Sequence, residues 1–267
     1  MKIVIVIPVY KTCPDETEKM SLRQCLKVLS DYEICLICPY GLSTTVYDEV
    51  ANGKMKTERF AQNYFENISG YNDLMKSHMF YERFKNYDYL LIYQLDAWVF
   101  RDELEEWCVR DYDYIGAPWF ENWYSHEEGY DFMCVGNGGL SLRKVKKFLS
   151  ITEPSMQRLR SYKQILDRNR GWCRYWQSIV QYFSRNNKVN VFAEQNKDRW
   201  EDVYFCYDLK ASRLELRVPD CKEAAQFSME TSPKYIFNEV NKGHLPFGCH
   251  AWKKYQYEEF WKYYIKL

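Results

Sequence analysis

Short apolar runs alternate with amphipathic segments in the first 100 residues, and this alternation constrains the fold more than any other feature of the sequence. The run Ile3–Ile7 contains only isoleucine and valine and stops at Pro8, which is typical of a strand buried on both faces. The same analysis predicts helices over residues 16–30 and 71–84 and further strands over residues 34–38 and 89–93. Strand–helix–strand order predicts an α/β fold with a mostly parallel, doubly wound sheet.

The second half of the chain is less regular. Residues 133–142 indicate a strand interrupted by Gly136, Gly138 and Gly139. Helices are expected over residues 172–183 and 219–229. The sequence contains no internal repeat and no linker-like segment, so we expect a single domain over residues 1–267.

Composition excludes several classes of protein. The 37 basic and 37 acidic residues balance, so there is no overall positive field for nucleic acid. Aromatic residues make up 18% of the chain; rings of this kind fill cores, but they also suit sugar faces and nucleobases. The ten cysteines are scattered, which favours free thiols in a reducing compartment. Cys35 and Cys38 lie three apart on a strand and point to opposite faces, which disfavours a zinc or redox pair.

The two ends of the chain raise the question of membranes. The apolar start is short, ends at Pro8 and lacks a cleavage site, and no stretch reaches the roughly 18 apolar residues of a membrane span. We therefore expect a cytosolic protein. The tail, residues 252–266, mixes aromatic rings with lysines and could lie at an anionic bilayer surface. The alternative is a helix packed on the domain through Tyr257, Phe260, Trp261 and Tyr264.

Two segments follow predicted strands at the edge where ligands bind in open α/β sheets. Pro8-Val9-Tyr10 follows the first strand, and Gln94-Leu95-Asp96 follows the strand over residues 89–93. Asp96 could hold Mg²⁺ or Mn²⁺ against a nucleotide diphosphate. It could equally sit in a turn or cap a helix that starts near Asp102.

Three further segments have a functional and a structural interpretation. Asn137-Gly138-Gly139 allows a ligand to approach the backbone closely, or forms a β-bulge. Glu201-Asp202 opens a predicted short helix over residues 203–209, where acidic residues are favoured in any case. His250 is either a ligand-binding residue or a structural histidine in an aromatic segment.

Taken in order, these segments resemble the GT-A glycosyltransferases from Ile3 to about Trp252. Residues 5–10 are similar to the first nucleotide-binding strand, and Gln94-Leu95-Asp96 occupies the place of the DxD motif. Residues 135–142 resemble the glycine-rich acceptor-side segment of inverting members. Glu201-Asp202-Val203-Tyr204 resembles the Glu-Asp-Val motif of β-1,3-galactosyl- and N-acetylglucosaminyltransferases, and residues 246–252 resemble the histidine segment that completes the metal site. Tyr-Gln-Leu-Asp-Ala and Phe-Gly-Cys-His-Ala-Trp are similar to motifs of a bacterial group with this fold.

The resemblance implies a nucleotide-binding half over residues 1–100 and an acceptor-binding half over residues 101–267. It implies transfer of a sugar from a nucleotide-sugar, with a UDP-sugar favoured, to a glycan or lipid-linked glycan. Asp202 would be the catalytic base, with neighbouring Glu201 as the competing candidate, and Asp96 and His250 would hold Mn²⁺ or Mg²⁺. The nucleotide-sugar site would comprise Pro8, Val9, Tyr10, Tyr71, Asn72, Gln94 and Asp96. The acceptor site would comprise Trp119, Asn137, Gly138 and Gly139.

Gln94 departs from the motif because an amide lends no charge to a metal, so metal affinity could be weak or metal dispensable. A retaining transferase, in which Asp202 only orients substrate, and a non-catalytic carbohydrate- or nucleotide-binding module are the alternatives. A nucleotidyltransferase is disfavoured because no glycine-rich triphosphate loop follows the first strand.

Overall fold

The computed structural model describes residues 1–121, 131–190 and 198–267. Its centre is a six-stranded sheet in the order β3-β2-β1-β4-β9-β6. β3, β2, β1 and β4 are parallel, whereas β9 runs antiparallel to both of its neighbours. The mostly parallel sheet predicted from the sequence is therefore confirmed. The strands are β1 (Ile3–Pro8), β2 (Glu33–Pro39), β3 (Lys56–Phe60), β4 (Tyr89–Tyr93), β6 (Tyr114–Ile115) and β9 (Leu140–Lys144).

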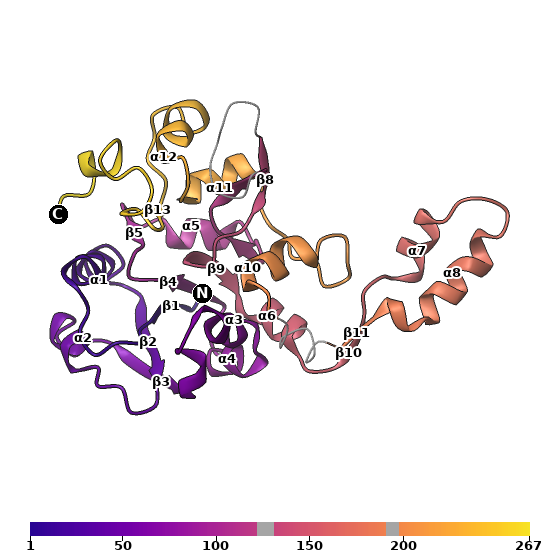
Figure 1. Cartoon of the computed structure of the whole chain (residues 1–267), viewed down its shortest axis with the longest axis horizontal. Helices are drawn as coiled ribbons and strands as arrows, with labels where there is room; N and C mark the ends of the chain where they lie inside the picture. Colours follow the sequence, from indigo (N-terminus) through magenta and orange to yellow (C-terminus); the bar gives the residue numbers. More distant parts are fainter. Residues whose placement is uncertain (122–130, 191–197) are drawn as a thin grey trace.

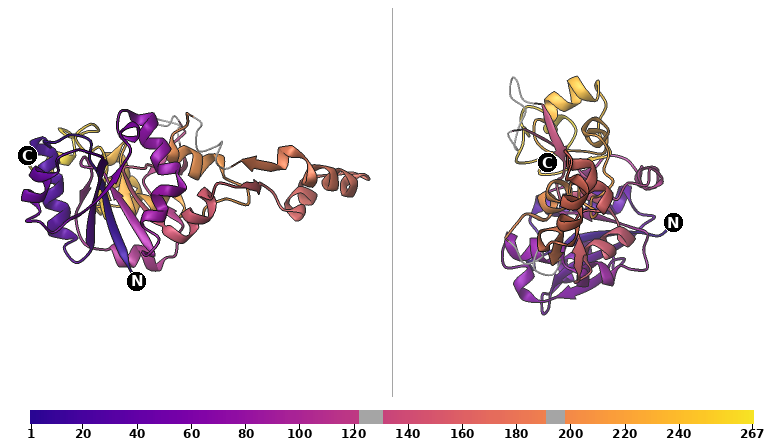
Figure 2. Two further views of the ribbon diagram at one scale, coloured as in Figure 1. Left: turned by 90° about the horizontal axis from the view of Figure 1, so that it is seen from below. Right: turned by 90° about the vertical axis from the view of Figure 1, so that its right-hand side faces the viewer.

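Helices cover both faces of this sheet, which explains why its central strands β1 and β4 are apolar throughout (Figure 2). Along β1, Ile3, Ile5 and Ile7 contribute to the core on one face, whereas Val4 and Val6 contribute to the core on the other. The first core is closed by α1 (Glu16–Val28), α2 (Thr45–Val50) and α5 (Leu104–Val109), and the second by α3 (Ile68–Lys76), α4 (His78–Arg83) and α6 (Val145–Thr152).

Two predicted elements are each split in the structure. The helix expected over residues 71–84 is α3 followed by α4, because Ser77 has extended backbone angles and its hydroxyl accepts the Phe80 N–H at 3.2 Å. The strand expected over residues 133–142 is β8 (Phe132–Val135), which pairs with β7 (Pro118–Phe120), followed by β9 in the main sheet. Asn137 turns the chain between them with a φ of 64°.

A small three-stranded sheet connects the C-terminal part to the main sheet. β13 (Gly248–Cys249) pairs in parallel with β12 (Ser228–Met229) and antiparallel with β5 (Trp98–Val99). Because β5 follows β4 directly, this pairing brings the segment after β13 to the carboxyl end of β4. The remaining body elements are α10 (Glu201–Val203) with a π-helical turn over Tyr204–Asp208, α11 (Cys221–Phe227), α12 (Pro233–Tyr235) with a π-helical turn over Ile236–Val240, and 3₁₀ turns over Gln62–Tyr64 and Trp261–Tyr263.

Residues 153–190 project from the body as an arm (Figure 1). Its stalk is the antiparallel pair β10 (Met156–Arg158) and β11 (Lys188–Asn190). Beyond the stalk, α7 (Tyr162–Arg168) packs against α8 (Arg174–Phe183), followed by a 3₁₀ turn over Arg185–Asn187. α8 is the helix predicted over residues 172–183.

All ten cysteines are free thiols, as the sequence predicts. Cys35 and Cys38 belong to the cores on opposite faces of the sheet, so they cannot form one site. Among the described residues, no helix combines the length and apolar character needed to cross a bilayer.

The C-terminal tail packs on the body, although it is not the helix we expected. It consists of turns and a 3₁₀ turn, and the side chains of Phe260, Trp261 and Ile265 are buried in a cluster with Trp252. The Trp261 ring stacks on Phe100 with 5.8 Å between ring centroids. These rings are therefore held in the protein interior rather than presented to a bilayer. Tyr257 is also packed there, whereas Tyr264 is 39% exposed.

Replacing Trp261 should show how much stability the packed tail contributes. We expect Trp261→Ala to lower the free energy of unfolding by about 3–5 kcal/mol, because a buried indole leaves a cavity. Tyr263→Ala is the matched control, since Tyr263 is 67% exposed, and should change stability by no more than about 0.5 kcal/mol. Urea denaturation measures both values; equal effects would mean that the tail is not docked.

Candidate active site

A cleft of about 730 Å³ opens at the carboxyl ends of β1 and β4. β2 and β3 lie on one side of β1 and β4 lies on the other, so the order of connections reverses between β1 and β4. This reversal is where open α/β sheets bind ligands. The structure brings every residue singled out in the sequence to this cleft, namely Pro8, Val9, Tyr10, Tyr71, Asn72, Gln94, Asp96, Trp119, Asn137, Gly138, Gly139, Glu201, Asp202 and His250.

His250 is the centre of a polar network on one side of the cleft. Its Nε2 lies 3.1 Å from Asp96 Oδ1 and 3.2 Å from Gln94 Oε1, and its Nδ1 lies 3.2 Å from Glu230 Oε1. Burial lowers the pKa of His250, but Asp96 and Glu230 outweigh this and raise it to about 10. Burial likewise opposes ionisation of Asp96, yet the charge of His250 keeps the pKa of Asp96 below its usual value. The network therefore favours the charged form of His250 and the charged form of Asp96.

Once His250 gives up the proton on Nε2, this nitrogen and the neighbouring oxygen atoms could hold a divalent cation together with a substrate phosphate. Asp96 Oδ1, Gln94 Oε1 and His250 Nε2 converge from two elements, and the Asp96 side chain is 53% exposed toward the cleft. In residues 1–121, 131–190 and 198–267, no group of three His, Cys, Asp or Glu side chains has the arrangement of a complete metal site. Mg²⁺ and similar ions are commonly held by one or two protein ligands together with substrate phosphates. Glu230 would orient the imidazole from its other nitrogen.

The glycine-rich segment makes room for side chains of the protein itself. A β-carbon at Gly138 would lie 2.1 Å from Glu201 Oε1, and one at Gly139 would lie 2.1 Å from His250 Nε2. Asn137 holds this turn, since its Oδ1 accepts the Gly139 N–H at 3.1 Å. Glycine is therefore required here for the approach of Glu201 and His250, which neither sequence interpretation of this segment anticipated.

Glu201 forms a buried ion pair with Arg143 of β9. The Arg143 Nη2 to Glu201 Oε1 distance is 2.7 Å, and both side chains are almost completely buried. Arg143 also donates to Tyr81 Oη at 3.0 Å and to Ser141 Oγ at 3.1 Å. The Glu201 backbone N–H donates to Asn72 Oδ1 at 2.9 Å. The contact with Arg143 thus fixes α10 to β9, and the contact with Asn72 fixes it to α3.

Asp202 is the member of the acidic pair that is oriented toward the open cleft. Its Oδ2 accepts the Gly138 N–H at 2.9 Å and its Oδ1 accepts the Val203 N–H at 2.8 Å. Burial, followed by the charge of Glu201, raises the pKa of Asp202 to about 7, although these hydrogen bonds and Arg143 oppose the shift. A carboxyl group that titrates near neutral pH is suited to proton transfer.

The other residues predicted from the sequence form the walls of the cleft. Val9 is buried and Pro8 is half-buried, whereas the Tyr10 ring is 64% exposed at the rim. Tyr71 lines the cleft from α3. Trp119 is buried on the far side, where its ring covers Gly136 so closely that a β-carbon there would meet it.

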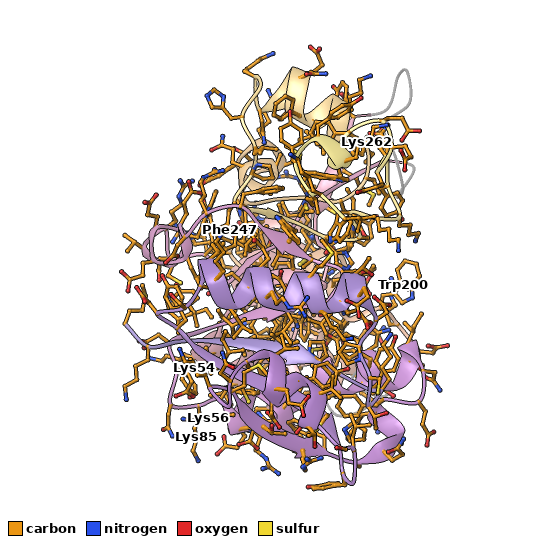
Figure 3. All side chains as sticks on the ribbon, turned by 90° about the vertical axis from the view of Figure 1, so that its left-hand side faces the viewer. Lys54, Lys56, Lys85, Trp200, Phe247 and Lys262 are labelled. Carbon is orange, nitrogen blue, oxygen red and sulfur yellow. The ribbon has the colours of Figure 1, made fainter. Side chains whose placement is uncertain are left out.

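Sequence reasoning missed several residues of the site. Glu230 and Arg143 carried no sequence signal: the first follows a two-residue strand, and the second resembles a surface residue of β9. Thr231 lines the cleft, and its buried Oγ1 has no hydrogen-bond partner among the described residues. Trp200 precedes the Glu201-Asp202 pair and is 52% exposed, with its ring at the edge of the molecule in Figure 3. Its position next to an acidic pair was the signal that could have identified it.

Residues 54–250 match the model of a family described as "Protein of unknown function (DUF5672)". The chain belongs to this family. No curated protein matches its sequence.

The chain is also similar to solved glycosyltransferase structures. For mouse xyloside xylosyltransferase 1 the TM-score is 0.49 at 12% identity, covering 94% of this chain and 97% of that chain. For the galactosyltransferase LgtC in complex with donor and acceptor sugar analogs, the TM-score is 0.47 at 13% identity, covering 92% of this chain and 86% of that chain. For core-mannan synthase A from Aspergillus fumigatus in its Mn/GDP form, the TM-score is 0.40 at 9% identity, covering 76% of this chain and 71% of that chain. At these scores the likeness does not identify a substrate or a residue's role.

Disrupting the buried ion pair between Arg143 and Glu201 should show how much it contributes to the stability of the fold. We expect Arg143→Met to lower the free energy of unfolding by about 3–5 kcal/mol, because Glu201 would remain buried without its counter-charge. Adding Glu201→Gln should recover a large part of this loss, since an amide carries no charge into the interior. Urea denaturation of the single and double variants measures the coupling. Additive losses would contradict the ion pair as described.

Proposed function

We propose that the protein is a glycosyltransferase that moves a sugar from a nucleotide-sugar, with a UDP-sugar favoured, to an acceptor hydroxyl of a glycan or lipid-linked glycan. The observation that carries this proposal is the arrangement of one cleft. Asp96 and His250 lie where β4 ends, and Asp202, with its pKa near neutrality, lies against the glycine turn. A diphosphate bound at Asp96 and His250 would place the attached sugar between these two residues and Asp202.

The donor side supplies groups for a nucleotide and its diphosphate. The β1 end, with Val9 and Tyr10, would form the wall against the nucleoside. Lys11 lies at the same cleft, where it is paired with Glu18 at 2.7 Å. Thr231 Oγ1 and Glu201 Oε2 are buried at the cleft without hydrogen-bond partners in the described structure. Polar atoms of this kind are usually satisfied by a bound ligand or water.

On the acceptor side, Asp202 would act as the general base of an inverting, single displacement. The acceptor oxygen would form a bond to the anomeric carbon while the bond from that carbon to the diphosphate oxygen breaks. The hydroxyl proton would pass to Asp202, and the bonding electron pair would leave with the nucleoside diphosphate. Trp119, Asn137, Gly138 and Gly139 would bound the sugar and acceptor subsites. Glu201, committed to Arg143, would hold Asp202 in place.

The divalent cation would be held by Asp96 and His250, with Gln94 as a neutral oxygen ligand. When bound, such an ion neutralises charge that builds up on the departing diphosphate. Gln94 adds no charge of its own, and this favours a second candidate function, a nucleotide-sugar-binding module without catalysis. The two functions differ in product: both predict donor binding, and only the first predicts transfer.

Replacing Asp202 by its isosteric amide tests the base. We expect Asp202→Asn to keep the donor affinity and to lose about 10²–10⁴-fold in turnover, because an amide cannot accept the proton. In the parent enzyme, kcat/KM should rise about tenfold per pH unit below pH 7 and level off above it, as the carboxylate form becomes populated. The variant's residual activity should lack this rise.

Asp208→Asn is the matched control for this experiment, because Asp208 lies on the same short segment but pairs with Arg199 outside the cleft. Near-parental turnover in Asp202→Asn would exclude it as the base. Analysis of the product anomer separates inversion from retention. Binding of the donor without any product would favour the non-catalytic module.

The metal ligands can be tested through donor binding. We expect a UDP-sugar with Mn²⁺ to raise the melting temperature of the parent protein, because a ligand of the native state stabilises it. Chelator and Asp96→Ala should each remove most of this shift, whereas Asp31→Ala, an exposed loop residue away from the cleft, should leave it intact. A parallel screen of GDP-, CMP- and dTDP-sugars identifies the nucleobase of the donor. An unchanged shift in Asp96→Ala would mean that the donor binds without this cation.

A further inference from the structure

The outer helix of the arm, α8, exposes its apolar face to solvent. Its apolar side chains recur at positions i, i+1, i+4, i+5 and i+8 and therefore share one side of the helix. Trp172, directly before the helix, is 100% exposed. The exposed fractions on the helix are Tyr175 54%, Trp176 74%, Ile179 37%, Val180 67% and Phe183 66%.

The side of α8 that faces α7 carries Ser178 and the ring of Tyr182, which packs on Tyr162 with 6.1 Å between ring centroids. Ser178 is completely buried, and its hydroxyl accepts a hydrogen bond from Asn169 Nδ2 at 2.9 Å. A helix that merely packs on its own domain has the opposite arrangement, with the apolar stripe inside. A contiguous exposed stripe of large apolar side chains marks an interaction surface.

Charge is concentrated on the same arm. Residues 153–190 contain eight lysines and arginines, one glutamate and one aspartate, while the whole chain balances 37 basic with 37 acidic residues. The arm therefore carries a net charge of +6 and the rest of the chain −6. Among the arm's basic residues, Lys163, Arg168, Arg170, Arg185 and Lys188 are exposed.

The arm is also placed where a flat surface can reach it. It extends away from the body on the two-stranded stalk in both long views (Figures 1 and 2). Gly171, with a φ of 86°, forms the turn between its two helices directly before Trp172. The body therefore does not lie between the exposed stripe and an approaching surface.

We propose that this arm binds the surface of an anionic phospholipid membrane. Trp172 and the apolar stripe of α8 enter the headgroup region, and the surrounding arginines and lysines pair with lipid phosphates. The arm of a second copy is a poorer partner, because two arms of charge +6 repel each other. Nucleic acid is disfavoured because Ile179 and Val180 offer nothing to stacked bases. This membrane contact does not depend on the proposed glycosyltransferase activity.

Vesicle flotation with the full-length protein tests the proposal. We expect the protein to float with phosphatidylcholine vesicles that contain phosphatidylglycerol, and to bind much more weakly to phosphatidylcholine alone or at high salt. Combining Trp172→Ser, Trp176→Ser and Phe183→Ser should lower the partition coefficient about tenfold or more. These side chains are exposed, so the fold should persist, which circular dichroism and the melting temperature verify.

Two further variants make the test specific. Combining Tyr40→Ser, Val109→Ser and Tyr263→Ser removes a similar set of exposed side chains from the body, and this control should float like the parent protein. Combining Arg168→Glu, Arg170→Glu and Arg185→Glu should lower binding to anionic vesicles only. The proposal fails if the parent protein does not float or if the aromatic arm variant floats equally well. It also fails if sedimentation shows a dimer that this variant abolishes in the absence of vesicle binding.

Discussion

The buried ion pair between Arg143 and Glu201 connects the sheet to the chemistry of the cleft. Arg143 belongs to β9, the antiparallel strand inserted into the sheet, and Glu201 begins α10. Two charges removed from water at this depth are costly unless each is paired and hydrogen-bonded. Tyr81, Ser141 and the charge of Glu201 meet this requirement around Arg143. The pair thereby fixes the position of Asp202, the next residue along the chain.

The glycine turn is the second constraint on the site, and it depends on the first. Gly138 accommodates Glu201 and donates its N–H to Asp202, while Gly139 accommodates His250. Asn137 adopts a left-handed backbone conformation in this turn. Its side chain stabilises that conformation by accepting a hydrogen bond from the Gly139 N–H. One short segment thus aligns the candidate base on one side with the candidate cation-binding group on the other.

The body and the arm carry net charges of opposite sign, and this difference suggests that they bind different partners. The acidic body holds the cleft, where carboxylates are arranged around His250 and Arg143. The basic arm carries the exposed apolar stripe and joins the body between α6 and α10. A membrane bound at the arm would bring lipid-linked acceptors to the same molecule that presents Asp202. Both proposals would then concern one reaction at a membrane surface, although each is tested separately.

The amino-acid sequence alone predicts β1, β2 and β4 and the points where they end, but it indicates neither β3 nor β6. Ile3–Ile7 and Tyr89–Tyr93 are apolar at every position, and such runs are stable only when both faces are covered. The residues that follow them had to lie at the ligand edge. Only the tertiary structure decided which side chains meet there. The pairing of β13 with β5 places His250 beside Asp96, 154 residues away along the chain. Arg143 pairs with Glu201, which lies 58 residues further along the chain. Local patterns cannot encode such contacts, because they arise from packing between elements. The same reason applies to α8: the sequence predicts a helix over residues 172–183, but only the position of the arm shows that the apolar side of this helix faces solvent.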